Sequence, residues 1–181
     1  MSKIFGQIRQ IAFVVRDIEQ AIHYWTETLG IGPFFMMRRV YPDNYQYKGQ
    51  PSPPPLMSLA FANSGPLQVE LIQQHDDHPS AYRDFLMAGK EGFQHVSAWV
   101  SRVEYDRIME RTISSGTMVL HEGSLLEGSV RFAYFGTDTV PGGLIYEIAD
   151  LIEPPLIPVI EMIEGAARNW DGEDPIRALE G

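Results

Sequence analysis

Residues 92–100, Gly-Phe-Gln-His-Val-Ser-Ala-Trp-Val, decide how the rest of the chain is interpreted, because they resemble residues 8–15, Ile-Arg-Gln-Ile-Ala-Phe-Val-Val. Both stretches are typical of β-strands, since β-branched and aromatic side chains dominate them. Each stretch carries one side chain that can bind a metal, His95 or Gln10, and each is followed by a turn and an amphipathic helix. The sequence therefore predicts one structural unit used twice.

A second pair of predicted strands places a glutamate inside apolar sequence, Glu70 in Leu67–Ile72 and Glu147 in Leu144–Ile148. A bare carboxylate is costly in a half-buried strand, so it requires a counter-charge or a raised pKa. A divalent cation would supply that charge. Because alternate residues of a strand share one face, these glutamates can converge with Gln10 and His95 if the strands curl into a trough. The alternative is that both glutamates face solvent and His95 is an ordinary core histidine.

The order strand, helix, three strands occurs in residues 1–75 and again in residues 92–150, with a connecting helix predicted in 76–91. This order indicates an α+β fold of two βαβββ modules. Residues 41–55 are rich in proline and are expected to form a loop that either covers a pocket or has no role. Residues 151–181 are a C-terminal extension with a short apolar-faced helix, which we expect to pack on the body or on a second subunit.

Composition excludes several classes of protein. The 181 residues carry a net charge of −10, and the 14 lysines and arginines form no cluster, so a nucleic acid partner is not expected. There is no cysteine, which excludes disulfides and thiolate chemistry. No apolar run approaches the roughly 18 residues that span a bilayer. We therefore expect a cytoplasmic protein without a membrane partner.

These stretches resemble the vicinal oxygen chelate superfamily, which includes glyoxalase I, methylmalonyl-CoA epimerase, extradiol dioxygenases and bleomycin-resistance proteins. The resemblance covers about residues 7–150, and "VELIQ" (69–73), "GFQHVSAWV" (92–100) and "GGLIYEIAD" (142–150) carry it, together with the first strand and helix. It implies a cupped mixed sheet with a divalent metal, Zn, Ni, Co or Mn, at its floor. The implied ligands are Gln10, Glu70, His95 and Glu147, a set similar to that of eukaryotic glyoxalase I. We also expect a homodimer.

The activity that the resemblance implies is metal-assisted proton transfer next to a carbonyl group, by an isomerase, epimerase or lyase acting on a small, partly apolar substrate. Glu147 is the implied base and Glu70 its counterpart. One alternative is a metal-independent binding protein of the bleomycin-resistance type. A ring-cleaving dioxygenase is a weaker alternative, because such enzymes use two histidines and this chain has one histidine at the implied ligand positions.

The expected substrate-binding residues come from the strands around the trough. Phe35, Met37 and Tyr134 supply apolar or aromatic surface, and Ser58 stands where methylmalonyl-CoA epimerases have a further glutamate. Arg131 is expected to pair with a carboxylate or phosphate of the substrate.

Overall fold

The computed structural model describes residues 2–136 and 143–179, so residues 137–142 of the second module and the last two residues of the chain lie outside the description. The strands are β1 (Ile8–Val14), β2 (Phe34–Val40), β3 (Asp43–Tyr47), β4 (Gln50–Pro51), β5 (Met57–Ser64), β6 (Leu67–Gln74), β7 (Gly92–Trp99), β8 (Val119–Leu125), β9 (Val130–Phe135), β10 (Ile145–Ala149) and β11 (Ile176–Ala178). The helices are α1 (Ile18–His23), which continues as the π-helix η1 (Tyr24–Thr28), α2 (Ala81–Met87), α3 (Arg102–Ser114) and α4 (Ile157–Arg168).

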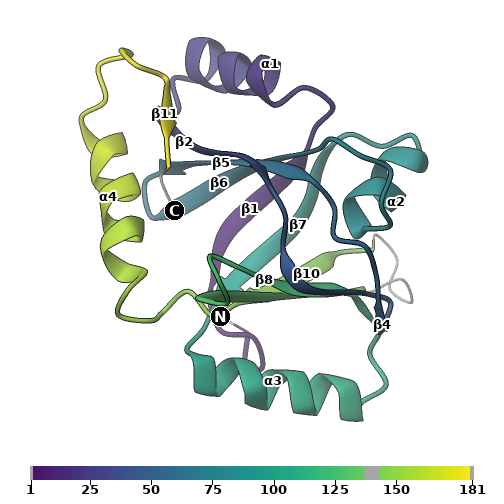
Figure 1. Ribbon diagram of the computed structural model, residues 1–181. Coiled ribbons are helices and arrows are strands. Elements are labelled where there is room, and N and C mark those ends of the chain that lie inside the picture. The colour runs from purple at the N-terminus through teal and green to yellow at the C-terminus, as the bar shows by residue number, and fades with distance from the viewer. Residues whose placement is uncertain (1, 137–142, 180–181) are drawn as a thin grey trace.

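The described strands form one sheet in the order β11-β2-β5-β6-β1-β7-β10-β9-β8-β3-β4. Strand β1 pairs in parallel with β6, and β7 pairs in parallel with β10, so the two halves repeat the same connection. The halves are joined at the centre, where β1 and β7 pair antiparallel. The mixed sheet of two βαβββ units confirms the predicted α+β fold (Figure 1).

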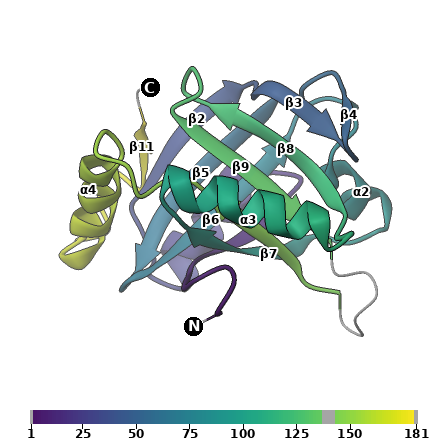
Figure 2. The ribbon, with the colours of Figure 1, turned by 90° about the horizontal axis from the view of Figure 1, so that it is seen from below.

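Each unit packs one helix on the outer surface of the sheet, α1 on the first unit and α3 on the second (Figures 1 and 2). Local sequence fixes where both helices begin. The Asp17 carboxylate accepts a hydrogen bond from the Gln20 amide at 3.0 Å, and Ser101 forms a capping box with Glu104. The regular α-helix after Asp17 is short, because it becomes a π-helix at Tyr24.

Strand alternation sends neighbouring apolar residues of the sheet to opposite faces, where they join different core clusters. On the first unit, Phe34, Met36 and Leu71 point outward and pack against α1. The neighbouring residues, among them Met37 and Ile72, point to the inner face, where they meet residues of the second unit such as Phe132 and Tyr134. The inner face is therefore shared by the two units, and the metal-capable side chains lie on it.

Residues 41–55 are not the loop that the prolines predicted. They contain β3 and β4, and β3 pairs antiparallel with β8 of the second unit. Tyr45 of β3 is buried, and the Lys48 amide donates to the Leu120 carbonyl oxygen at 2.8 Å. Gly123 of β8 allows the close approach, because a Cβ atom there would lie 3.2 Å from the Asp43 carbonyl oxygen. The segment thus connects the first unit to the far edge of the second.

The C-terminal extension is tied to the body at two places. Strand β11, which the sequence did not predict, pairs in parallel with β2 at the other edge of the sheet. Helix α4 lies beside β11 and against β5 (Figure 1). None of the described helices is long and apolar enough to cross a membrane.

Candidate metal centre and cavity

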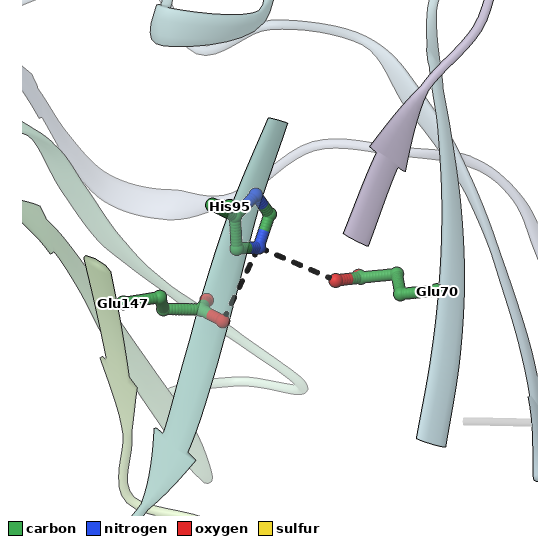
Figure 3. Close-up of side chains that lie close together, drawn as sticks. All are labelled: Glu70, His95 and Glu147. Carbon is green, nitrogen blue, oxygen red and sulfur yellow. Dashed lines mark ion pairs between the residues drawn. The ribbon is translucent and has the colours of Figure 1, made fainter. Parts of the chain in front are cut away.

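Two glutamates and a histidine from three strands meet at the inner face. The Nε2 atom of His95 on β7 lies 3.5 Å from a carboxylate oxygen of Glu147 on β10 and 3.8 Å from one of Glu70 on β6 (Figure 3). One ligand atom of each residue lies within 4.8 Å of the others, and all three side chains are buried. Three of the four predicted ligands therefore converge on one point.

Strand register explains this convergence. Ala12 of β1 pairs with Glu70 on one side and with His95 on the other. Since Ala12 has only a methyl group, the carboxylate and the imidazole can face one another across it. Glu147 reaches the same point from the far side of β7.

The fourth predicted ligand, Gln10, lies in the adjacent row of polar residues. Register places Gln68, Gln10, Ser97 and Glu147 side by side on β6, β1, β7 and β10. Gln10 Nε2 donates to Gln68 Oε1 at 2.8 Å, so the amide of Gln10 is fixed. The Ser97 hydroxyl is buried without a hydrogen-bond partner among the described residues, although it stands between Gln10 and Glu147. An unpaired buried hydroxyl is costly, and a ligand at this floor would relieve that cost.

The sequence argument missed Gln68 and Ser97. Each lies two residues from a predicted ligand, Glu70 or His95, and so shares its strand face. This two-residue spacing is the pattern from which Gln68 and Ser97 could have been predicted.

The neighbours of His95 set its tautomer. Gln94 Nε2 donates to the Ala81 carbonyl oxygen, so Gln94 Oε1 is free to accept from His95 Nδ1 at 2.8 Å. The other nitrogen, Nε2, then carries the lone pair that faces both glutamates, and the Tyr134 hydroxyl donates to it at 3.2 Å. Holding the second nitrogen in this way is how proteins orient metal-binding histidines.

The electrostatics of the cluster favour a cation. Burial, and secondarily the Glu147 carboxylate, raises the pKa of Glu70 well above its usual value. Among the described residues, no lysine or arginine forms an ion pair with Glu70 or Glu147, and the basic side chain within 4 Å of both is His95, whose Nε2 presents a lone pair. Two carboxylates and an imidazole that presents a lone pair form a donor set suited to a divalent ion such as Zn²⁺, and its charge would offset theirs. The residues therefore fit the metal that the resemblance implied.

A cavity of about 120 Å³ lies over this floor. Gln10, Gln68, Glu70 and Glu147 form its polar side, and the remaining lining is apolar. Met37, predicted to contact substrate, lines the cavity. Tyr134 contacts His95 instead of lining the cavity, and Phe35 packs under the guanidinium of Arg177.

Two predicted substrate residues are on the wrong face of the sheet. The Ser58 hydroxyl accepts from the Arg39 amide and bonds His75 Nε2 at 2.8 Å, on the outer side. Arg131 also points outward, where its guanidinium donates to Asp150 and Asp106 and lies over the ring of Tyr105. Neither residue lines the cavity, because each is one position out of phase with the strand residues that do.

A buried histidine of the second unit completes the inner face. His121 of β8 bonds the Tyr45 hydroxyl at 3.0 Å, and its ring lies edge-on to Tyr134. Burial, with a smaller contribution from His95, lowers the pKa of His121 to about 3, so it is neutral. The sequence analysis assigned no role to His121.

The fold and the site together define a protein of paired βαβββ units with a metal-capable acidic and histidine cluster between them. Residues 9–134 match the model of the Glyoxalase/Bleomycin resistance protein/Dioxygenase superfamily, and the chain belongs to that family, as the sequence resemblance predicted. No curated protein matches the chain in sequence.

Solved structures show the same fold at low sequence identity. A hypothetical protein, BH1468, from Bacillus halodurans C-125 has 16% identity and a TM-score of 0.54, over 79% of this chain and 92% of that one. Methylmalonyl-CoA epimerase from Mycobacterium tuberculosis has 18% identity and a TM-score of 0.53, over 82% and 90%. A selenomethionine form of methylmalonyl-CoA epimerase has 18% identity and a TM-score of 0.50, over 82% and 97%.

Proposed function

We propose that the protein is a metal-dependent enzyme that moves a proton next to a carbonyl group, as an isomerase, epimerase or lyase. The observation that carries this proposal is the buried meeting of Glu70, His95 and Glu147 at the floor of a cavity. Gln10, in the adjacent row, is the proposed fourth ligand. Zn, Ni, Co and Mn are the candidate ions.

A divalent ion held by these residues would supply Lewis acidity toward the oxygens of the substrate. The side chains do the rest. Glu147 lines the cavity and is the proposed base that removes the proton from the carbon next to the carbonyl group. Glu70 also lines the cavity and is the proposed counterpart of Glu147, which returns a proton to the substrate at its other position. Two carboxylates with different environments can thereby share the acid and base roles.

The test has a binding arm and a chemical arm. Calorimetry should show one Zn, Ni, Co or Mn ion bound per chain, and His95→Ala should lose that binding while His23→Ala, at an exposed histidine, keeps it. The loaded protein should catalyse deuterium uptake from D₂O at the carbon next to the carbonyl group of 2-hydroxyacetophenone. Glu147→Gln should slow this exchange by about 100-fold or more, whereas Glu110→Gln on the exposed side of α3 should not. Failure of every ion to bind would end the proposal.

One observation favours a second candidate, a metal-independent binding protein. Both nitrogens of His95 already have protein partners, Gln94 and Tyr134, and Gln10 is paired with Gln68. A site satisfied in this way could sequester a ligand without an ion. Calorimetry with 2-hydroxyacetophenone in the presence of a chelator separates the two candidates, because undiminished binding supports sequestration and lost binding supports the metalloenzyme.

A further inference from the structure

The C-terminal extension builds part of the apolar side of the cavity. Leu156 at the N-cap of α4 contributes, as do Val159, Ile160 and Ile163 within the helix, and Leu179 follows β11. We call these five residues the C-terminal wall. All of them lie beyond residues 9–134, which match the family model. The wall thus lies outside the two βαβββ units, directly over the proposed catalytic floor.

The size of the cavity limits what can lie between the floor and the wall. Its volume is about 120 Å³. An apolar cavity of about 150 Å³ in another protein binds benzene. The space therefore suits a body about as large as one six-membered ring or a short branched aliphatic group. A drug-sized ligand, which fills about 300 Å³ or more, would have to extend out of the open side of the cavity.

The charge of the lining limits the substrate further. Among the described residues that line the cavity, Glu70 and Glu147 are ionisable, and there is no lysine, arginine or histidine. Arg131, the cation expected to meet a substrate carboxylate, is held on the outer face by Asp150. An anionic group at the far end of the substrate would lose its hydration against the C-terminal wall and would find no cationic partner there. That loss is strongly unfavourable.

We propose that the C-terminal wall determines specificity, and that it selects a small carbonyl compound whose remaining body is apolar, uncharged and about the size of one ring. This inference rests on the proposed function, since the carbonyl end must lie at the metal-capable floor. The wall excludes phosphate esters and substrates with a distal carboxylate.

Hydroxamates test the proposal, because they bind metal ions through two adjacent oxygens and can carry different bodies. On the zinc-loaded full chain, calorimetry should show benzohydroxamate binding at least tenfold more tightly than acetohydroxamate, which lacks the ring. Benzohydroxamate should also bind at least tenfold more tightly than 4-carboxybenzohydroxamate, which carries a charged group on the far side of the ring. Trp99, which lines the cavity, gives a second readout through its fluorescence. Equal affinities for the three probes would overturn the proposal.

A matched pair of substitutions on α4 isolates the wall. Val159 lines the cavity but is 36% exposed, and Met162 on the same helix is 45% exposed and does not line it, so lysine is tolerable at both positions. Val159→Lys should bind 4-carboxybenzohydroxamate at least tenfold more tightly than the wild type, because its ammonium group can pair with the distal carboxylate. Met162→Lys should leave the preference unchanged, and identical behaviour of the two variants would contradict the wall's role.

The acetohydroxamate arm separates this inference from the proposed function. If zinc-loaded protein binds no hydroxamate at all, the proposal that Glu70, His95 and Glu147 hold a catalytic metal ion is wrong. The wall is then tested by saturation-transfer NMR of benzyl alcohol in the presence of a chelator. Binding that is reduced by Val159→Lys and kept by Met162→Lys supports the wall as a ligand surface, and absence of binding overturns it.

Discussion

Glu70 lies in an environment very different from that of a surface glutamate, because its side chain is buried beside a second carboxylate. Its pKa is raised by burial and by Glu147. In the metal-free protein, between the usual value of about 4.5 and the raised pKa, the folded state keeps a proton that the unfolded state has lost. The stability of the metal-free protein should therefore fall as pH rises through this range. Each pKa unit corresponds to about 1.4 kcal/mol.

We predict that Glu70→Gln removes this loss and stabilises the metal-free protein at pH 8 by on the order of 1–3 kcal/mol. Urea denaturation in the presence of a chelator, from pH 5 to pH 8, measures the effect. The gain should grow with pH. Glu110→Gln is the control, since its carboxylate is exposed. A difference between Glu70→Gln and wild type that does not change with pH would show that the charge of Glu70 costs nothing in the fold.

Strand parity decided which of the predicted site residues lie on the inner face. Glu70 and Glu147 could be placed on the inner face because each is a lone acidic residue in an apolar strand. Ser58 and Arg131 could not be placed from their strands alone, since a shift of one position moves a side chain to the opposite face. Arg131 faces outward because Asp150, which is fully buried, accepts hydrogen bonds from its amide and its guanidinium. That partner lies at the end of another strand, so no local pattern reveals it.

At the scale of elements, the segment 41–55 shows why proline content misled the prediction. Pro42 precedes β3, Pro51 lies in the short edge strand β4, and the other three prolines follow β4, so each stands where a missing amide hydrogen costs little. The strand itself is stabilised by a partner, β8, that lies about half the chain away. Non-local pairing of this kind leaves no periodic signal in the segment. Strand β11, which is three residues long, was missed for the same reason.

Tyr45 should be the anchor of β3. Its hydroxyl donates to the Pro79 carbonyl oxygen at 2.9 Å and lies 3.0 Å from His121 Nδ1. Tyr45→Phe should lower the free energy of unfolding by about 1 kcal/mol, and Tyr45→Ala by about 3–5 kcal/mol because it also empties a buried site. Urea denaturation measures both changes, and hydrogen exchange at the Lys48 amide should become faster.

Tyr41→Ala is the matched control for this prediction, since the Tyr41 side chain is 53% exposed in the same segment. It should change stability by less than about 0.5 kcal/mol. If Tyr45→Ala were no more damaging than Tyr41→Ala, the pairing of β3 with β8 would not contribute to stability.

For the whole molecule, the site depends on both units of one chain. Glu70 comes from the first unit, and His95 and Glu147 come from the second, so a bound ion would cross-link the two across the β1–β7 pair. The predicted homodimer stays a prediction, because the three groups meet without a second subunit. The repeat made this convergence predictable, whereas the wall formed by α4 was not, since the extension has no counterpart in the repeat.

A ligand that binds only the folded state stabilises it in proportion to the logarithm of its concentration, which makes the shared site measurable in unfolding. If the protein binds zinc with a Kd of about 1 μM, 1 mM zinc should raise the free energy of unfolding by about 4 kcal/mol. Unfolding should remain a single transition, because both units hold the ion. Thermal scans with zinc and with a chelator check this, and hydrogen exchange should slow in β6 and β10 together.

Addition of zinc to His95→Ala should produce no such rise in stability, while His23→Ala should behave as wild type. If zinc slowed hydrogen exchange only in the second unit, Glu70 would not hold the ion and the two units would not share it.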